Sequence, residues 1–236
     1  MSFAGNVKIL RLIEGAKQAE GLTVIIDVFR AFSLECYLFD MGAAEIRPIG
    51  SIEDALAWGA KDPNCVLIGE RGGAKVDGFE FGNSPSTVNP DRIRGSRVIH
   101  TTSAGTQGVV NAVHADQIIS GSLVNAKAIA TYIKKVNPAK VSLVCMGQAG
   151  VAPAREDEVC AEYIKAILLD EDLTEFDEII KSLQRDGGEH FFTMDRQHIY
   201  PEKDFWMCIE KDKFDFVIRI EKDELGFVSR KTEVTA

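Results

Sequence analysis

The sequence lacks the features that identify several common classes of protein. No run approaches the roughly 18 apolar residues that cross a membrane. The amino-terminal segment shows no basic region followed by an apolar one, as a secretory signal does. The five cysteines and four histidines are scattered, without the spacing of a structural zinc site. We therefore expect a soluble, cytoplasmic protein with reduced cysteines and no membrane partner.

Positive charge is also scarce. The chain of 236 residues carries 27 Lys and Arg against 36 Asp and Glu, which gives a formal net charge of -9. Such a field repels polyanions, so a general nucleic-acid binder is excluded. Because 45% of the residues are hydrophobic, the chain can bury a sizeable core. Any anionic substrate must be met by local positive groups.

Three familiar phosphate-handling motifs are missing. The chain has no Walker-type Gly-Lys-Ser/Thr loop. Asp27-Val-Phe lacks the second aspartate of the haloacid-dehalogenase phosphatases. Cys65 and Arg71 have the Cys-x5-Arg spacing of tyrosine phosphatases, but the residues between them read as an extended strand, which cannot form a phosphate cradle.

What is present is a regular alternation of short apolar runs and helix-period segments from residue 22 to about residue 170. This alternation predicts an α/β fold with a mainly parallel sheet flanked by helices. The predicted strands cover residues 22–26, 44–49, 65–68, 97–100, 117–120 and 140–145. The predicted helices cover residues 31–41, 51–60, 125–136 and 156–169.

After residue 170 the sequence becomes charged and rich in aromatic residues. Residues 204–230 are interpreted as two or three antiparallel strands, forming a C-terminal antiparallel strand layer. We expect an α/β core over residues 1–170 and a C-terminal α+β portion over residues 171–236, packed on the core and not independent of it. The aromatic tail makes a homodimer the expected assembly.

Acids, arginines, hydroxyls and glycines follow the predicted strands. Ligands of open parallel sheets bind beyond the carboxyl ends of the strands, where helix amino termini offer unpaired N–H groups. Carboxylates hold a hard cation, arginines bind oxyanions, and glycine lets backbone amides approach phosphate. A phosphate ester with a divalent cation is the natural ligand. The strand-end segments are 27–30, 50–51, 69–73, 101–106, 121–122 and 147–150, the last of which leads to Glu156 and Asp157.

Each of these features also has a structural interpretation. Asp27 can cap the helix that follows it, and residues 101–106 can form an ordinary helix start. The segment Phe81-Gly82-Asn83-Ser84-Pro85 can be only a turn. Glu156 and Asp157 open a helix, where the dipole favours acids. Glu156 nevertheless falls on the buried stripe of that helix, where a carboxylate needs a partner. His100 is more typical of a hydrogen-bonded structural histidine.

Taken together, these motifs resemble the 2-phosphosulfolactate phosphatase family, over residues from about 20 to 230. The resemblance rests on six motifs and on their order along the chain. They are Asp27-Val-Phe-Arg30, Gly69-Glu70-Arg71-Gly72-Gly73, the turn at residues 81–85, the threonine-rich turn at residues 101–106, Gly121-Ser122 and Glu156-Asp157-x-x-Cys160-Ala161. It implies Mg²⁺-dependent hydrolysis of 2-phospho-3-sulfolactate to 3-sulfolactate and phosphate, a step of coenzyme M synthesis in methanogens. The chain departs from the family's usual Thr, Asn and Gly at Phe32, Ala104 and Glu162.

The resemblance and the strand-end positions together define the candidate site. The alternatives are a phosphatase for another small phosphorylated hydroxy acid, and a non-catalytic binder of an anionic metabolite. The expected cofactor is Mg²⁺, with Asp27, Glu156 and Asp157 as candidate ligands. Candidate catalytic residues are Asp27, Arg30, Glu70 and Arg71, and candidate substrate-binding residues are Asn83, Ser84, Thr101, Thr102, Ser103, Gly105, Thr106 and Ser122.

Overall fold

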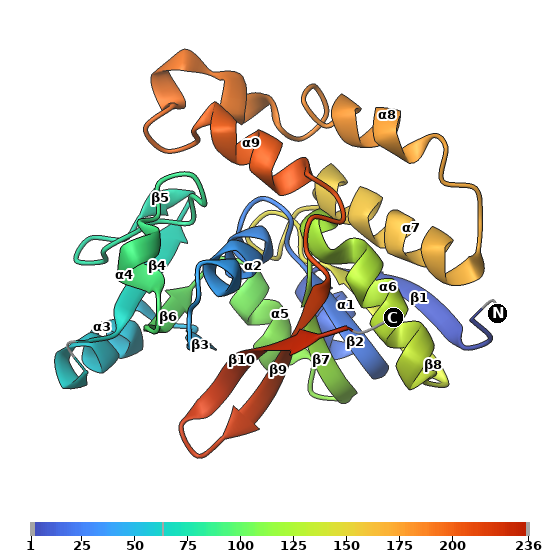
Figure 1. Ribbon diagram of the computed structural model, residues 1–236, viewed down its shortest axis with the longest axis horizontal. Coiled ribbons are helices and arrows are strands. Elements are labelled where there is room, and N and C mark those ends of the chain that lie inside the picture. Colours follow the sequence, from blue (N-terminus) through green and yellow to red (C-terminus); the bar gives the residue numbers. More distant parts are fainter. Residues whose placement is uncertain (1–2, 63, 235–236) are drawn as a thin grey trace.

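The computed structural model describes residues 3–62 and 64–234 and contains one ten-stranded sheet flanked by helices (Figure 1). The strand order is β1-β8-β2-β7-β9-β10-β3-β6-β4-β5. The predicted α/β class is confirmed, and all six predicted strands are present. The strands are β1 (Asn6–Arg11), β2 (Gly21–Ile26), β3 (Glu45–Pro48), β4 (Val66–Arg71), β5 (Ala74–Lys75), β6 (Arg97–Thr101), β7 (Ala115–Gly121), β8 (Lys140–Cys145), β9 (Phe216–Asp223) and β10 (Gly226–Glu233).

The sheet consists of two parallel groups joined by an antiparallel hairpin. Strands β1, β8, β2 and β7 are parallel, as are β3, β6 and β4. Strands β9 and β10 pair with each other, and they pair antiparallel with β7 and β3 on either side. The predicted antiparallel strands are therefore present, and they lie within the sheet between its two halves (Figure 1).

All four predicted helices are present. The helices are α1 (Leu12–Lys17), α2 (Ala31–Asp40), α3 (Ile52–Lys61), α4 (Pro90–Ile93), α5 (Gly105–Asn111), α6 (Ala126–Val136), α7 (Arg155–Leu169), α8 (Phe176–Ser182) and α9 (Glu202–Ile209), with 3₁₀ helices η1 (Leu123–Asn125), η2 (Glu189–Phe192) and η3 (Met194–Arg196). Ser51 caps α3 as expected, since its hydroxyl accepts a hydrogen bond from Asp54 N. The prediction of strands from residue 204 onward is wrong at its start, because Asp204 to Ile209 belong to α9.

Strand β2 lies at the centre of the first parallel group, and all six of its residues are buried. Its side chains alternate between two cores, as the period of two in a strand requires. Val24 and Ile26 pack in the core that contains the apolar faces of α6 and α7, whereas Ile25 packs with residues of α1 and α5. Coverage on both faces explains the continuous apolar run in the sequence.

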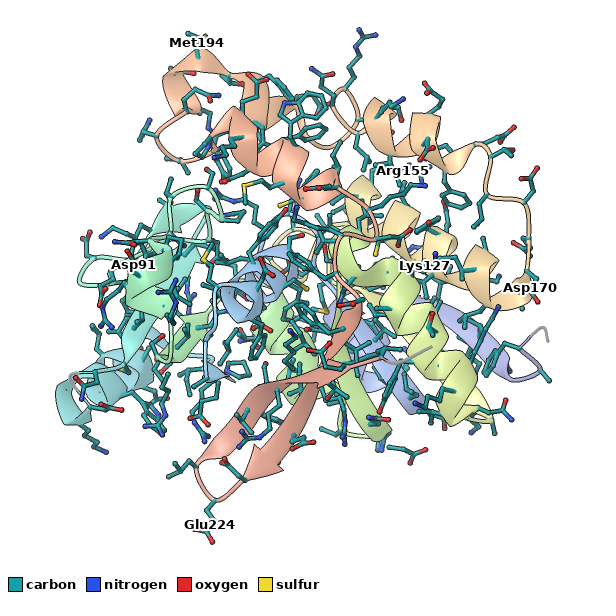
Figure 2. All side chains as sticks on the ribbon, viewed as in Figure 1. Asp91, Lys127, Arg155, Asp170, Met194 and Glu224 are labelled. Carbon is teal, nitrogen blue, oxygen red and sulfur yellow. The ribbon has the colours of Figure 1, made fainter. Side chains whose placement is uncertain are left out.

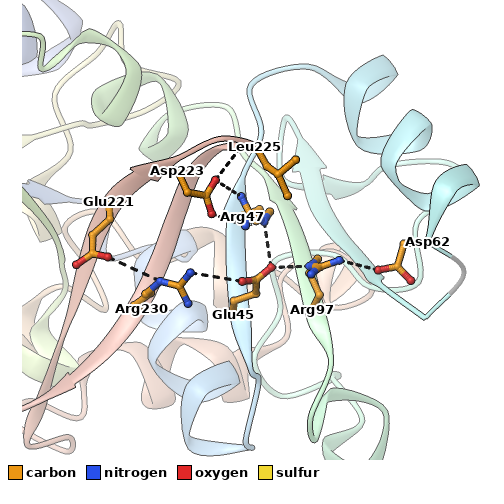
Figure 3. A network of polar contacts seen from close by, with 8 residues as sticks. All are labelled: Glu45, Arg47, Asp62, Arg97, Glu221, Asp223, Leu225 and Arg230. Atoms are coloured by element: carbon orange, nitrogen blue, oxygen red, sulfur yellow. Dashed lines mark hydrogen bonds and ion pairs between the residues drawn. The ribbon is translucent and has the colours of Figure 1, made fainter.

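The two halves of the sheet meet at a sparse backbone junction. Strands β10 and β3 share one paired position, Ser229 with Ile46. Beside it, the buried Arg47 binds Glu45 and makes a bidentate contact to Asp223 on the hairpin (Figure 3). The network continues through Arg97, Asp62, Arg230 and Glu221. Side-chain ion pairs thus reinforce a junction that has little backbone pairing.

Two further expectations concern the chain as a whole. The five cysteines are all buried and free of disulfides, as predicted. Across residues 3–62 and 64–234, no helix is both long and apolar enough to span a membrane.

Candidate active site

A cleft of about 490 Å³ opens where the turns after β2, β4, β6 and β8 meet the start of α7. The structure brings seven of the predicted site residues together in its lining. Residues between 190 and 200, from the segment that joins α8 to α9, line it as well. The predicted residues in the lining are Asp27, Arg30, Glu70, Asn83, Ser103, Glu156 and Asp157.

Asp27 lies directly after β2 and is almost completely buried. Its Oδ1 accepts a hydrogen bond from Ala31 N at 3.3 Å, and its Oδ2 accepts one from Gly105 N at 3.0 Å. A side chain at Gly105 would place its first carbon 3.1 Å from that Oδ2 and 2.9 Å from the ring of Phe32. Gly105 therefore serves the site through its backbone, and the absence of a side chain permits the close approach.

Asp157 connects the turns that follow two neighbouring strands. Its Oδ1 accepts a hydrogen bond from Val28 N and its Oδ2 accepts one from Gly147 N, both at 2.8 Å. Burial, then the negative charge of Glu156, raises the pKa of Asp157. Burial, followed by the charges of Asp157 and Glu70, likewise raises the pKa of Asp27. The two aspartates are thus held by backbone amides in an environment that opposes their ionisation.

Glu70 has a similar role on the other side of the cleft. Its Oε1 accepts a hydrogen bond from Ser103 N at 2.7 Å, and its Oε2 accepts one from Gly73 N at 2.8 Å. The hydroxyl of Ser103 donates to Oε2 at 3.2 Å. Glu70 thereby holds the turn after β6 against the turn between β4 and β5.

Glu156 is the acid with most of its hydrogen-bonding capacity unused. It is buried beside Gly187, yet no other residue in the described part of the chain donates a hydrogen bond to its side chain. Burial, then the charges of Asp27, Glu189 and Asp186, raises the pKa of Glu156. A buried carboxyl with no partner beyond its own backbone N–H needs a proton or a cation, so Glu156 is the clearest candidate ligand.

Arg30 lines the cleft but is largely occupied by protein acceptors. Its Nη1 donates to Asp204 Oδ2 at 2.8 Å and to Ile199 O at 2.9 Å, while its Nη2 donates to Gly73 O at 3.1 Å. Asp204 is fully buried and also accepts a hydrogen bond from the hydroxyl of Ser84. Arg30 therefore fixes the surrounding loops at least as much as it faces a ligand.

The remaining predicted residues lie outside the cleft lining. Arg71 turns away from it and donates to Glu70 O, Gly50 O and the hydroxyl of Thr101. Thr102 and Thr106 bond each other across one helical turn, which supports the interpretation of a helix start. The others bond within the protein: Ser84 to Asp204, Thr101 to Arg71, and the fully buried Ser122 to Ser33.

Asn83 is supported from behind by a buried polar chain. Its Oδ1 lies 3.1 Å from His100 Nε2, and His100 Nδ1 lies 3.0 Å from Glu35 Oε1. Both His100 and Glu35 are completely buried. His100 is therefore structural, as the sequence suggested, and it positions a cleft residue. Glu35 lies within an apolar helix, and nothing in the sequence singled it out.

Sequence reasoning missed three residues of the cleft, His190, Arg196 and Tyr200. They come from the segment whose structure the sequence left open. The adjacent Phe191 is fully buried in the core. The sequence contains one local indication of His190, Arg196 and Tyr200 as site residues: an arginine and aromatic residues stand within an acidic stretch that has no hydrophobic periodicity.

The departures from the usual family residues differ in their distance from the cleft. Phe32 and Ala104 pack in the same apolar cluster, so two positions that are usually polar are apolar together here. Ala104 lines the cleft, whereas Phe32 lies behind Gly105. Glu162 has a half-exposed side chain and faces Arg155 at 3.6 Å, away from the cleft lining.

The carboxyls fit a hydrated divalent cation better than a closed metal cage. Among the described residues, no group of three or more His, Cys, Asp or Glu side chains is placed so that it could hold a metal ion. Asp27, Glu156 and Asp157 still line one water-accessible cleft, and the charge of a neighbouring acid in this set raises the pKa of each. Mg²⁺ usually binds one or two carboxylates and keeps waters or substrate phosphate oxygens as its other ligands. The donor set is compatible with that mode.

The fold and the cleft together define an α/β protein with a cleft at its strand ends that is lined by buried acids and by two arginines. A comparison of the sequence with known protein families identifies the family of this chain. The model of the 2-phosphosulpholactate phosphatase family matches residues 8–223, and the chain belongs to this family.

Curated relatives agree with this assignment. A protein of Bacillus subtilis is 29% identical over 84% of this chain and 86% of its own length. One from Caldicellulosiruptor saccharolyticus is 31% identical over 84% and 88%, and one from Deinococcus radiodurans is 34% identical over 71% of each chain. Each carries the name "Probable 2-phosphosulfolactate phosphatase".

Proposed function

We propose that this protein is a Mg²⁺-dependent phosphatase that hydrolyses 2-phospho-3-sulfolactate to 3-sulfolactate and phosphate. Membership of the family and the names of the relatives support the substrate. The observation that carries the proposal is the set of three buried carboxyls, Asp27, Glu156 and Asp157, that line one cleft with arginines. Buried acids with mutually raised pKa values in a cleft are typical of catalytic sites.

In this proposal the cation is held by Glu156 with Asp27 or Asp157. Bound Mg²⁺ would supply positive charge to neutralise the phosphoryl oxygens, which is the main requirement of phosphoryl transfer. The protein contributes fixed geometry, because backbone amides hold both oxygens of each aspartate. Because these carboxylates are already ordered, little free energy is needed to reorganise them during the reaction.

Asp27 is the first candidate for the group that reacts. Burial and two neighbouring acids raise the pKa of Asp27, so its carboxylate is a stronger base than an exposed one and can accept a proton from an attacking water. The alternative is that Asp27 attacks phosphorus itself as a nucleophile. In both cases the amides of Ala31 and Gly105 orient the carboxylate.

The first test measures phosphate release from a panel of phosphorylated hydroxy acids, with the wild type and with Asp27→Asn, in the presence of Mg²⁺. We expect 2-phospho-3-sulfolactate to be the preferred substrate and Asp27→Asn to lower kcat by about 10²-fold or more, since general base catalysis contributes about that factor. Full activity of Asp27→Asn would remove Asp27 from the chemistry.

The same panel separates the two alternatives. A phosphatase for another small phosphorylated hydroxy acid would prefer that compound, a result that the apolar pair Phe32 and Ala104 would help to explain. A non-catalytic binder would bind panel members and release no phosphate. The homodimer stays a prediction, with Trp206 on α9, which is 45% exposed, as a candidate contact.

A further inference from the structure

One arginine in the cleft lining lies against an aromatic ring but has no acidic or hydrogen-bonding partner in the described part of the chain. Arg196 is exposed, and its guanidinium lies 4.8 Å from the ring centroid of Tyr200. Within the part of the chain that the structure describes, its side chain makes no ion pair and no hydrogen bond. Its backbone is nevertheless fixed, because the carbonyl of Arg196 accepts hydrogen bonds from Ile199 N and Tyr200 N. An ordered main chain thus presents an unpaired cation at the cleft.

The other basic groups of the lining are not free in this way. Arg30 is paired with the buried Asp204 and with two carbonyls. Burial, then the charges of Arg30 and Arg196, lowers the pKa of His190 to about 4, so this imidazole is neutral near pH 7. Among the described residues that line the cleft, Arg196 is therefore the cation available for a ligand.

Tyr200 sets the distance between the two arginines. The guanidinium carbon of Arg30 lies 4.9 Å from the same ring centroid, so the two cationic groups are less than about 10 Å apart. The Tyr200 hydroxyl donates to Gly72 O at 3.2 Å, which ties this ring to the turn after β4. A small ligand whose phosphate lies beside Arg30, next to a cation held by the acids as proposed above, can therefore reach Arg196 with a second acidic group.

We propose that Arg196 binds an acidic group of the substrate other than the phosphate, and so selects substrates that carry two or more oxyanions. This inference rests on the proposed function, because it assigns a role within the same cleft. In 2-phospho-3-sulfolactate the second group is the sulfonate or the carboxylate. Either offers the coplanar oxygen pair that a guanidinium binds with two hydrogen bonds.

The test compares kcat/KM for three compounds. They are 2-phospho-3-sulfolactate, 2-phospholactate, which lacks the sulfonate, and 2-sulfoethyl phosphate, which lacks the carboxylate. The variants are Arg196→Gln and Arg196→Lys. The matched control is Arg94→Gln, which changes another exposed arginine that lies outside the cleft lining and pairs with Asp91. Figure 2 shows Asp91 well apart from Met194, which lies on the turn that carries Arg196.

We expect Arg196→Gln to lower kcat/KM for the full substrate by about 10- to 100-fold, mainly through KM, as for loss of a charge-assisted hydrogen bond to an oxyanion. The loss should be less than about threefold for the analogue that lacks the bound group, which identifies that group. Arg196→Lys should recover part of the loss because it restores the charge. Arg94→Gln should leave all three values unchanged.

Two results would overturn the assignment while leaving the proposed function intact. Equal losses for all three compounds would mean that Arg196 acts on the phosphate or only through Tyr200. No loss for any compound would mean that Arg196 is not part of the site. If the wild type released phosphate from none of the three, the proposed function would itself fail, together with the role of Arg196 that depends on it.

Discussion

At the scale of single residues, the acids of the cleft have two roles at once. Asp27, Glu70 and Asp157 each accept backbone hydrogen bonds from turns that follow different strands. The same side chains line the cleft. Replacing any of them therefore changes both the local structure and the chemistry, and isosteric amides are the most informative substitutions because they retain one acceptor oxygen.

The sequence could predict these acids but not the partners of the arginines. Carboxylates directly after apolar strands have little freedom, so their positions follow from the fold. Arg71 has a long side chain, and its guanidinium binds Gly50 and Thr101 instead of facing the cleft. Arg196 lies in a stretch without hydrophobic periodicity, where sequence patterns carry no information on position.

Two adjacent glycines provide a residue-scale prediction. Gly72 and Gly73 both have positive φ, 59° and 86°, so alanine costs backbone strain at either position. Only at Gly73 would the added carbon collide with Tyr200, 1.8 Å from its hydroxyl oxygen, while nothing lies within 4 Å at Gly72. We expect Gly73→Ala to lower kcat/KM by at least about tenfold, because displaced binding groups lose alignment.

Gly72→Ala is the matched control for this prediction. It carries a similar backbone penalty and should lower kcat/KM by less than about threefold, since no displacement of Tyr200 follows. Equal kinetic effects of the two substitutions would show that the position of Tyr200 is not important for activity.

At the scale of secondary-structure elements, hydrophobic periodicity and capping residues were sufficient for most strands and for the four longest helices, α2, α3, α6 and α7, but not for the shorter helices. The prediction of a strand at residues 204–209 is wrong because Phe205, Trp206 and Cys208 are residue types that favour strands. Pro201 before the helix and the acids Glu202 and Asp204 in its first turn are the residues that favour helix α9. The place of the hairpin could not be predicted, because pairing of β9 with β7 and of β10 with β3 is non-local.

The placement of the hairpin has a consequence for the site. Because β9 and β10 intervene with antiparallel pairing, β3 runs opposite to β7 along the sheet. Gly105, after β6, nevertheless bonds Asp27, after β2. The sheet must therefore bend or twist strongly between its halves to bring both sets of carboxyl ends together. The expectation that strand-end residues meet holds for the acids of the cleft but not for Arg71 or the threonines, and it assumed one continuous parallel sheet.

The ion pairs at the junction of the two halves yield the element-scale prediction. Arg47→Met should lower the free energy of unfolding by about 1–3 kcal/mol, since it leaves Glu45 and Asp223 without a shared buried partner. Urea denaturation measures the change. Arg94→Met removes an exposed pair with Asp91 and should change stability by less than about 0.5 kcal/mol. An effect of Arg47→Met no larger than this control would mean that the network does not support the junction.

At the scale of the whole molecule, buried acids link stability to pH, and the proposed function adds a link to a divalent cation. Burial and neighbouring acids raise the pKa values of Asp27 and Asp157 to about 8. Their contribution to stability is complete below their ordinary pKa of about 4 and is lost as the pH rises through about 8. A cation that binds the ionised carboxylates offsets this loss, and protons compete with it at low pH.

We therefore expect Mg²⁺ to raise the Tm by several degrees at pH 8 and by much less at pH 5, since about 1 kcal/mol corresponds to roughly 2–4 °C in a protein of this size. Sodium chloride at equal ionic strength is the control for screening. Glu156→Gln should reduce the Mg²⁺ effect at pH 8, because it removes one candidate ligand. An equal Mg²⁺ effect at both pH values would argue against binding at the titrating carboxyls.

Phosphate release from 2-phospho-3-sulfolactate, followed as Mg²⁺ is varied, tests the central claim most directly. The account predicts a rate that rises to saturation with Mg²⁺, is abolished by a chelator, and falls by about 10²-fold or more in Asp27→Asn. Turnover that is unaffected by chelation and by Asp27→Asn would contradict it, as would the absence of any phosphate release from this compound at saturating Mg²⁺.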